Sequence, residues 1–113
     1  MSGEDFSLAE RILACVEAIP SGKVMSYGDI AEYVGSKAPR NVGRVLAADG
    51  GTVPWHRVLR ADGSCAEHLR GEQLARLRAE GVPIKGERVD LAAARWDGRP
   101  LRSAGRSRRP ARS

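Results

Sequence analysis

The sequence predicts a mainly α-helical domain of the helix-turn-helix class with a winged-helix-like addition, and three observations support this prediction. A capping box at Ser7 marks the start of a first helix, and a capping serine at Ser26 marks the start of a second. Pro39 lies where the first residue of a third helix is expected, because its fixed φ suits that position. The second and third helices are short and a tight turn separates them, which is the helix-turn-helix pattern.

The first helix is expected between Ser7 and Pro20. In the capping box, the Ser7 oxygen accepts a hydrogen bond from a free N–H of the first turn, and the Glu10 side chain reaches back to the backbone. Pro20-Ser-Gly22 ends the helix. Apolar residues recur at helical spacing along one face, which we expect to be buried: Leu8, Ile12, Cys15, Val16 and Ile19.

The second helix is expected to follow Ser26, with Asp29 three residues further on, and to end at Gly35. Glycine suits this end because it adopts the left-handed conformation without strain. The third helix is predicted over 40–48. The residues expected to face inward are Tyr27, Ile30, Ala31 and Val34 of the second helix and Val42, Val45 and Leu46 of the third.

The second half of the chain is predicted to add a small wing and a further helix. Val58-Leu59 is predicted to be extended backbone, and residues 61–63 are predicted to form the tight turn that completes the wing. A helix over 72–80 is expected to bury Leu74 and Leu77. The remaining expectations are a loop at 49–51, Gly81 as the end of the 72–80 helix, extended backbone at 82–84, a short strand at Val89 and Leu91, and a last helical turn over 92–96.

Composition predicts one small domain that does not span a membrane. The 113 residues are 42% hydrophobic, enough for one small core, and contain no apolar run of about 18 residues. The acidic start of the chain lacks the apolar stretch of a signal peptide, so we expect a cytoplasmic protein. Two cysteines do not make a disulfide framework, and the Cys and His spacings match no zinc motif. We therefore expect neither a metal nor a cofactor, and, with no heptad repeat, a monomer.

Positive charge is concentrated at the C-terminal end. The net charge is +5, yet residues 98–113 hold six arginines and no acid, which leaves −1 for residues 1–97. We expect 1–97 to form the domain and 98–113 to be a disordered basic tail. The tail is either a soluble terminus or an arm that attracts phosphates without reading sequence.

Four short motifs follow one another along the chain. They are Ile19-Pro-Ser-Gly-Lys-Val24, Ser26-Tyr-Gly-Asp-Ile-Ala31, Arg40-Asn-Val-Gly43 and Pro54-Trp-His-Arg-Val58. From about Ile12 to Gly81 the chain thereby resembles the DNA-binding, C-terminal domain of the O6-alkylguanine-DNA alkyltransferases. In those enzymes the last motif reads Pro-Cys-His-Arg, and its Cys takes the alkyl group from the base. Trp55 stands at that position here, as in the alkyltransferase-like proteins, which the chain resembles more closely.

This resemblance implies a protein that recognises DNA damage and is not an enzyme. It would bind O6-alkylguanine in duplex DNA, rotate the damaged nucleotide out of the helix, and flag it for nucleotide excision repair. An O6-alkylated guanine pairs poorly and costs less to extrude than a normal base. Because the Trp55 indole is neither a nucleophile nor an acid, no alkyl transfer is expected. The expected partners are the damaged duplex and excision-repair proteins.

The resemblance also implies site residues. Arg40 would enter the base stack in place of the flipped nucleotide, and Tyr27 would help to rotate it out. Two loops, 49–53 and 64–70, are shorter than usual in the family. In the second of these loops, Arg70 is the nearest candidate to contact the lesion and His68 the next. The implied lesion pocket is Tyr27, Trp55, Val58 and Arg70, and the implied contacts of a minor-groove helix are Ser26, Arg40, Asn41, Gly43, Arg44 and Ala47.

For five further residues we expect a structural role rather than a chemical one. His56 and Glu80 match the His and Glu that activate the enzymes' Cys, and we expect them to form a buried polar pair. Arg57 is expected to hold its loop rather than to touch DNA. Cys15 is expected to pack inertly in the core, and Cys65 to be a surface residue of a turn.

Two other functions stay open on the sequence alone. A helix-turn-helix transcriptional regulator would need base-reading side chains along the third helix, where only Asn41 and Arg44 are suitable and Ala47 is a poor reader. An active alkyltransferase would have to use Cys65, which lies three residues from His68. Binding to alkylated and plain duplexes, compared side by side, separates a lesion binder from a sequence reader.

Overall fold

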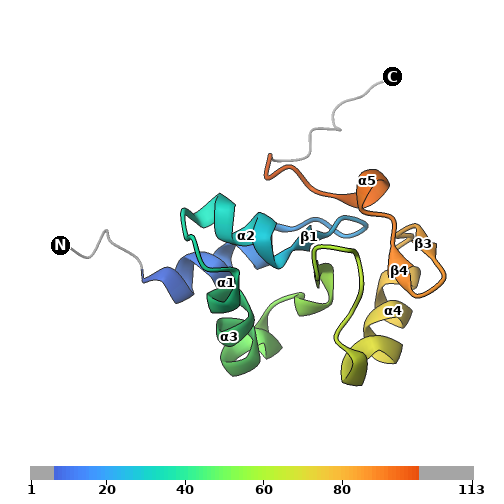
Figure 1. Cartoon of the computed structure of the whole chain (residues 1–113), viewed down its shortest axis with the longest axis horizontal. Helices are drawn as coiled ribbons and strands as arrows, with labels where there is room; N and C mark the ends of the chain where they lie inside the picture. The colour runs from blue at the N-terminus through green and yellow to red at the C-terminus, as the bar shows by residue number, and fades with distance from the viewer. Residues whose placement is uncertain (1–6, 100–113) are drawn as a thin grey trace.

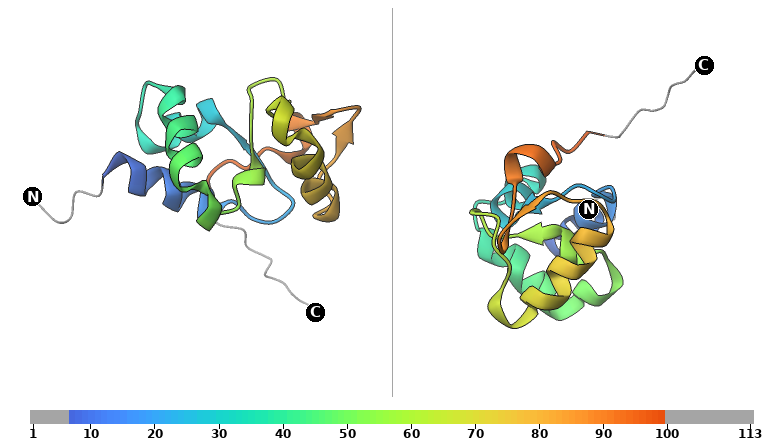
Figure 2. Two further views of the ribbon diagram at one scale, coloured as in Figure 1. Left: turned by 90° about the horizontal axis from the view of Figure 1, so that it is seen from below. Right: turned by 90° about the vertical axis from the view of Figure 1, so that its right-hand side faces the viewer.

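The computed structural model describes residues 7–99, which are mainly helical (Figure 1). Helices α1, α2 and α3 lie together on one side, and α4, α5 and a small hairpin lie on the other (Figures 1 and 2). The helices are α1 (Leu8–Ala18), α2 (Tyr27–Val34), α3 (Pro39–Asp49), α4 (Arg70–Ala79) and α5 (Leu91–Ala94). The strands are β1 (Met25–Ser26), β2 (Val58–Leu59), β3 (Ile84–Lys85) and β4 (Arg88–Val89), and the 3-10 turns are η1 (Gly50–Thr52), η2 (Trp55–Arg57) and η3 (Glu67–Leu69).

The two predicted helix starts at Ser7 and Ser26 are confirmed. Ser7 Oγ accepts from the Glu10 amide at 3.0 Å, while the Ser7 amide donates to Glu10 Oε1 at 3.0 Å. The same reciprocal pair links Ser26 and Asp29 at 3.0 and 2.9 Å. Both boxes satisfy amides that the first helical turn leaves free, so these local contacts fix where α1 and α2 begin.

The helix-turn-helix arrangement is also confirmed. Gly35 ends α2 with φ of +81°, the left-handed conformation that glycine adopts without strain, and Pro39 is the first residue of α3. Helix α3 runs to Asp49 and continues as η1, so the loop expected at 49–51 is wrong. No helix within residues 7–99 is long and apolar enough to cross a membrane.

The strands β1 and β2 separate two hydrophobic cores. They pair in parallel, with Met25 opposite Val58 and Ser26 opposite Leu59. Successive strand residues point to opposite faces, so Met25 and Val58 enter the first core while Leu59 enters the second. The first core is Ile12, Cys15, Val16, Ile19, Met25, Ile30, Ala31, Val34, Val42, Val58 and Trp96, and the second is Val24, Leu59, Cys65, Leu74, Leu77, Val82, Val89 and Ala94.

The prediction of a wing at 58–63 is wrong, because Val58-Leu59 pairs with β1 and forms no hairpin with the turn that follows it. Val58 and Leu59 are 2% and 1% exposed because they form the buried strand between the two cores, and the antiparallel hairpin is formed by β3 and β4 instead. The tight turn itself exists, since the Gly63 amide donates to the Arg60 carbonyl at 2.9 Å. Helix α4 begins at Arg70, before the predicted start, and Leu91 opens α5 rather than ending a strand.

The predicted basic tail, 98–113, lies outside the described residues except for Gly98 and Arg99. Trp96 Nε1 donates to the Arg99 carbonyl at 2.8 Å, and the Tyr33 hydroxyl lies 3.5 Å from the Gly98 carbonyl. The chain therefore still contacts the helical body beyond residue 97, the predicted domain boundary.

Candidate nucleic-acid interface

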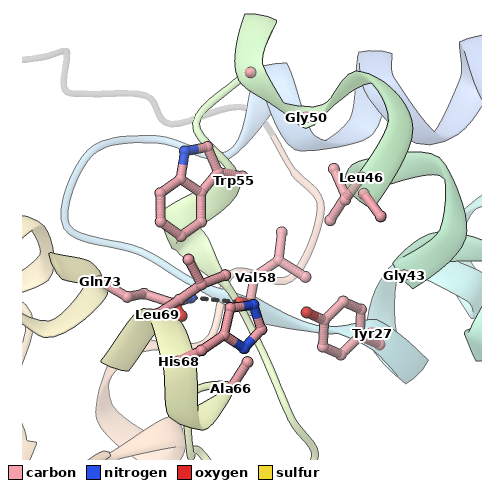
Figure 3. A pocket seen from close by; sticks show the side chains of 12 residues that line it. Tyr27, Gly43, Leu46, Gly50, Trp55, Val58, Ala66, His68, Leu69 and Gln73 are labelled. Atoms are coloured by element: carbon pink, nitrogen blue, oxygen red, sulfur yellow. Dashed lines mark hydrogen bonds between the residues drawn. The ribbon is translucent and has the colours of Figure 1, made fainter. Parts of the chain in front are cut away.

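A pocket of about 490 Å³ opens between α3, η2 and η3 (Figure 3). Its walls come from segments far apart in the sequence, which the β1–β2 pairing brings together. The lining residues are Tyr27, Gly43, Leu46, Ala47, Gly50, Gly51, Trp55, Val58, Ala66, His68, Leu69 and Gln73.

Three of the four predicted pocket residues line it. Tyr27 follows β1 at the start of α2, and Val58 opens β2 opposite Met25, so the ladder places both. Trp55 begins η2, and Figure 3 shows its ring and that of Tyr27 flanking the same space with Val58 between them. Burial raises the pKa of Tyr27, which keeps its hydroxyl protonated and able to donate.

Arg70 does not line the pocket. It is the first residue of α4, and its Nη1 lies 3.5 Å from Glu87 Oε1. The second candidate in that loop, His68, lies on the pocket lining instead, together with its neighbour Leu69. The short 64–70 loop forms η3, and this turn presents the side chains just before α4 to the cavity.

Helix α3 joins the pocket to an exposed surface. Arg40, Arg44 and Ala47 are exposed, and Asn41 and Gly43 are half-buried. Gly43 and Ala47 also line the pocket, and a Cβ at Gly43 would lie 4.0 Å from the Tyr27 ring. Within residues 7–99, neither Arg40 nor Arg44 forms an ion pair, so both guanidinium groups are free to meet phosphate or base.

Ser26 differs from the other predicted DNA contacts. Its side chain is buried and its hydroxyl caps α2 by accepting from the Asp29 amide. The structure therefore places Ser26 behind Tyr27 as a residue that sets the helix start, not on the exposed surface of α3.

Behind the pocket, Glu80 joins three segments through one carboxylate. Its Oε2 accepts from His56 Nε2 at 2.8 Å and Arg57 Nη2 at 2.7 Å, and its Oε1 accepts from Arg57 Nε at 3.0 Å and the Gly22 amide at 3.3 Å. Arg57 Nη1 also donates to the Ile19 carbonyl at 2.8 Å. The structure places His56 and Glu80 in direct contact, with His56 buried and Glu80 half-buried, and it ties the Arg57 side chain to Ile19 and Glu80.

This cluster keeps Glu80 ionised. Burial acts to raise the pKa of Glu80, but the hydrogen bonds from Arg57 and His56 outweigh it and lower the pKa from 4.5 to about 2. Because the carboxylate accepts from His56 Nε2, that nitrogen carries the hydrogen. His56 Nδ1 is buried and has no hydrogen-bond partner among the described residues. The cluster anchors η2, from which Trp55 projects.

Both cysteines are buried away from the pocket lining. Cys15 packs in the first core, where burial raises the pKa of its thiol to about 11. The expectation that Cys65 is a surface residue is wrong, since it is 3% exposed in the second core and burial raises its pKa as well. Neither Cys15 nor Cys65 is among the residues that line the pocket. Within residues 7–99, no group of three or more His, Cys, Asp or Glu side chains could hold a metal ion.

Gln73 is a pocket residue that the sequence reasoning missed. It is 3% exposed, and its Nε2 donates to the carbonyls of His56 at 3.1 Å and Val58 at 2.8 Å. These bonds join α4 to the backbone beside Trp55. One signal was available, because Gln73 lies one helical turn before the buried Leu77 and so occupies the inward face of α4.

The fold and the pocket define the class of the protein: a helix-turn-helix domain with an aromatic-lined pocket beside the second helix of the motif. Residues 7–82 match the family described as 6-O-methylguanine DNA methyltransferase, DNA binding domain. The chain belongs to this family, and within it to the alkyltransferase-like proteins, as the four sequence motifs predicted.

Named relatives support this placement. The DNA base-flipping protein of Escherichia coli K12 is 43% identical over 105 residues, which cover 86% of this chain and 79% of the relative. Alkyltransferase-like protein 1 of Schizosaccharomyces pombe is 40% identical over 81 residues, covering 66% and 75%. The crystal structure of S. pombe Atl1 in complex with damaged DNA containing O6-carboxymethylguanine aligns with a TM-score of 0.69 at 31% identity, covering 78% of this chain and 93% of that chain.

Proposed function

We propose that this protein binds O6-alkylguanine in duplex DNA, holds the flipped nucleotide in its pocket, and transfers no alkyl group. The observation that carries the proposal is the pocket itself: it lies beside α3, aromatic rings line it, and both thiols of the chain are buried elsewhere. Two relatives support the same proposal, since one is named a DNA base-flipping protein and the other an alkyltransferase-like protein.

The geometry gives each element a part in binding. Helix α3 would lie in the minor groove, where the small residues Gly43 and Ala47 permit close approach to the backbone. Arg40, exposed in the first turn of α3, would fill the space that the nucleotide leaves. The rotated base would then meet the rings of Tyr27 and Trp55, and stacking on an aromatic ring stabilises a flipped base by about 1–3 kcal/mol.

The same geometry opposes alkyl transfer. Transfer needs a thiolate that can attack the alkyl carbon while the base leaves. Trp55 offers no such group, and the Cys65 thiol is buried outside the pocket lining with a raised pKa. The bound lesion would therefore stay chemically intact and need other proteins to remove it. We propose that these other proteins are those of nucleotide excision repair. We also propose that the protein binds DNA as a monomer and is cytoplasmic.

A paired binding measurement tests the proposal. Two duplexes of identical sequence, one with a single O6-methylguanine and one with guanine, are titrated with the protein at the same salt concentration. We expect tighter binding to the alkylated duplex. Equal affinity for both duplexes, combined with a preference between different undamaged sequences, would favour the transcriptional regulator instead.

A further inference from the structure

Arg76 contacts Trp55 from outside the pocket. Its guanidinium carbon lies 5.5 Å from the centroid of the indole ring, the arrangement of a cation–π contact. Trp55 lines the pocket and Arg76 does not, so the cation touches the ring without occupying the space for a base. Arg76 Nη2 is also held 2.7 Å from Glu72 Oε2, one turn earlier on α4.

We propose that Arg76 is a positioning residue for lesion recognition: it fixes the Trp55 ring as the wall that a flipped base meets. The inference rests on the proposed function and adds a specificity residue to the same site. It assigns the Glu72–Arg76 pair on α4 to the binding of damaged DNA through Trp55, without direct contact to the base.

Trp55 needs such a support because its surroundings leave the ring partly open. The residue is half-buried and begins a short 3-10 turn, and its neighbour His56 meets it edge-on, with ring centroids 6.2 Å apart. A ring that can change rotamer in the free protein loses that freedom when a base stacks on it, which weakens binding. A cation held against the ring from α4 restricts this motion before the DNA arrives.

Arg78 supplies a matched control. It is exposed in the last turn of the same helix, it carries the same charge, and it forms no ion pair within residues 7–99. If Arg76 acted only by attracting phosphates, Arg76→Ala and Arg78→Ala would weaken binding to plain and alkylated duplexes alike. A residue that positions Trp55 must change the preference between the two duplexes.

The first experiment measures this preference as the ratio of the two dissociation constants, plain over alkylated. We expect Arg76→Ala to lower the ratio about two- to fivefold, the range of an exposed cation–π contact. Arg78→Ala should leave the ratio unchanged, and Arg76→Lys should restore part of it because lysine keeps the cation. In a Trp55→Ala background, Arg76→Ala should have no further effect on the ratio.

The second experiment needs no DNA. The chain has two tryptophans, so Trp96→Phe leaves Trp55 as the sole indole fluorophore. Adding Arg76→Ala to that variant should increase quenching of the fluorescence by acrylamide, while adding Arg78→Ala should not.

An unchanged ratio in a folded Arg76→Ala variant, or an equal loss in the Trp55→Ala background, would overturn the inference. Absence of any preference in the wild-type protein would instead reject the proposed function, and unchanged acrylamide quenching would then reject the positioning role as well.

Discussion

Tyr27 and Trp55 bring aromatic rings to the pocket from different elements, α2 and η2. If only a flipped base reaches them, as we propose, Tyr27→Ala and Trp55→Ala should each weaken binding to the alkylated duplex more than to the plain one, by about 1–3 kcal/mol. Tyr33→Ala is the control, since Tyr33 lies on α2 but is 53% exposed and packs near Trp96 instead. Equal losses on both duplexes would make the pocket rings purely structural. Equilibrium titration of each variant measures the effect.

Arg40 is exposed in the first turn of α3, a position where a cation opposes the helix dipole and gains nothing for stability. If it replaces the flipped nucleotide in the stack, Arg40→Ala should weaken binding to the alkylated duplex by about 1–3 kcal/mol. Arg44→Ala, one turn further along the same helix, should cost less and affect both duplexes equally. A folded Arg40→Ala variant with wild-type affinity would reduce Arg40 to a solvated helix end.

Through the cluster that it forms with His56 and Arg57, Glu80 makes the stability of the protein depend on pH. Its folded-state pKa of about 2 is below the ordinary 4.5, so its contribution is fully present above pH 4.5 and is lost as pH falls toward 2. Glu80→Gln should lower the free energy of unfolding at pH 7 by about 2–3 kcal/mol, because it leaves the Arg57 guanidinium without its carboxylate. Urea unfolding across this pH range should show a smaller acid loss for the variant. Parallel acid profiles would show that Glu80 is not the group that titrates.

At the scale of elements, the turn before η3 depends on one glycine. Gly63 has φ of +85°, and a Cβ there would collide with the carbonyl oxygen of Val89. Gly63→Ala should therefore destabilise the protein by about 3 kcal/mol. Gly71, on α4 with open space around it, is the matched control, and Gly71→Ala should stabilise by about 0.5–1 kcal/mol. Thermal unfolding of the two variants checks the contrast; a tolerated Gly63→Ala would contradict it.

The sequence predicted those elements whose causes are local. The capping residues Ser7 and Ser26, the glycine end of α2 and Pro39 act within a few residues, so α1, α2 and α3 could be located from the pattern. The β1–β2 pair joins residues more than thirty positions apart, and two-residue strands carry no alternation to reveal a partner. The wing was therefore misassigned.

The site residues divide in the same way, into those that a local motif marks and those that depend on distant contacts. Tyr27, Trp55 and Val58 were found through the motifs they lie in, which the family resemblance marked. Cys65 was misjudged because it follows a turn in the sequence, although the chain then enters the second core. Gln73 was missed because a single buried glutamine on a helix looks like any polar surface residue until its backbone partners are known.

At the scale of the whole molecule, the folded domain within residues 7–99 and the basic residues that follow it should contribute differently to DNA binding. Truncation after Arg99 keeps the carbonyl that accepts from Trp96 and removes five of the six arginines. If three of them engage phosphates, the log–log salt slope should flatten by about 2.7. The ratio of affinities for alkylated and plain DNA should stay nearly constant, since phosphates carry no lesion information. Salt titrations of both proteins on both duplexes measure this, and an unchanged slope would exclude a DNA arm.

The central claim is selective binding of the lesion without chemistry, and native mass spectrometry tests it most directly. The protein is mixed with equal amounts of the O6-methylguanine duplex and the plain duplex, whose masses differ by one CH2 unit because a methyl group replaces a hydrogen. We predict that the complex with the alkylated duplex dominates, and that protein and DNA released from it keep their original masses. Equal amounts of the two complexes, or a protein heavier by one CH2 unit beside a duplex lighter by the same amount, would contradict the account.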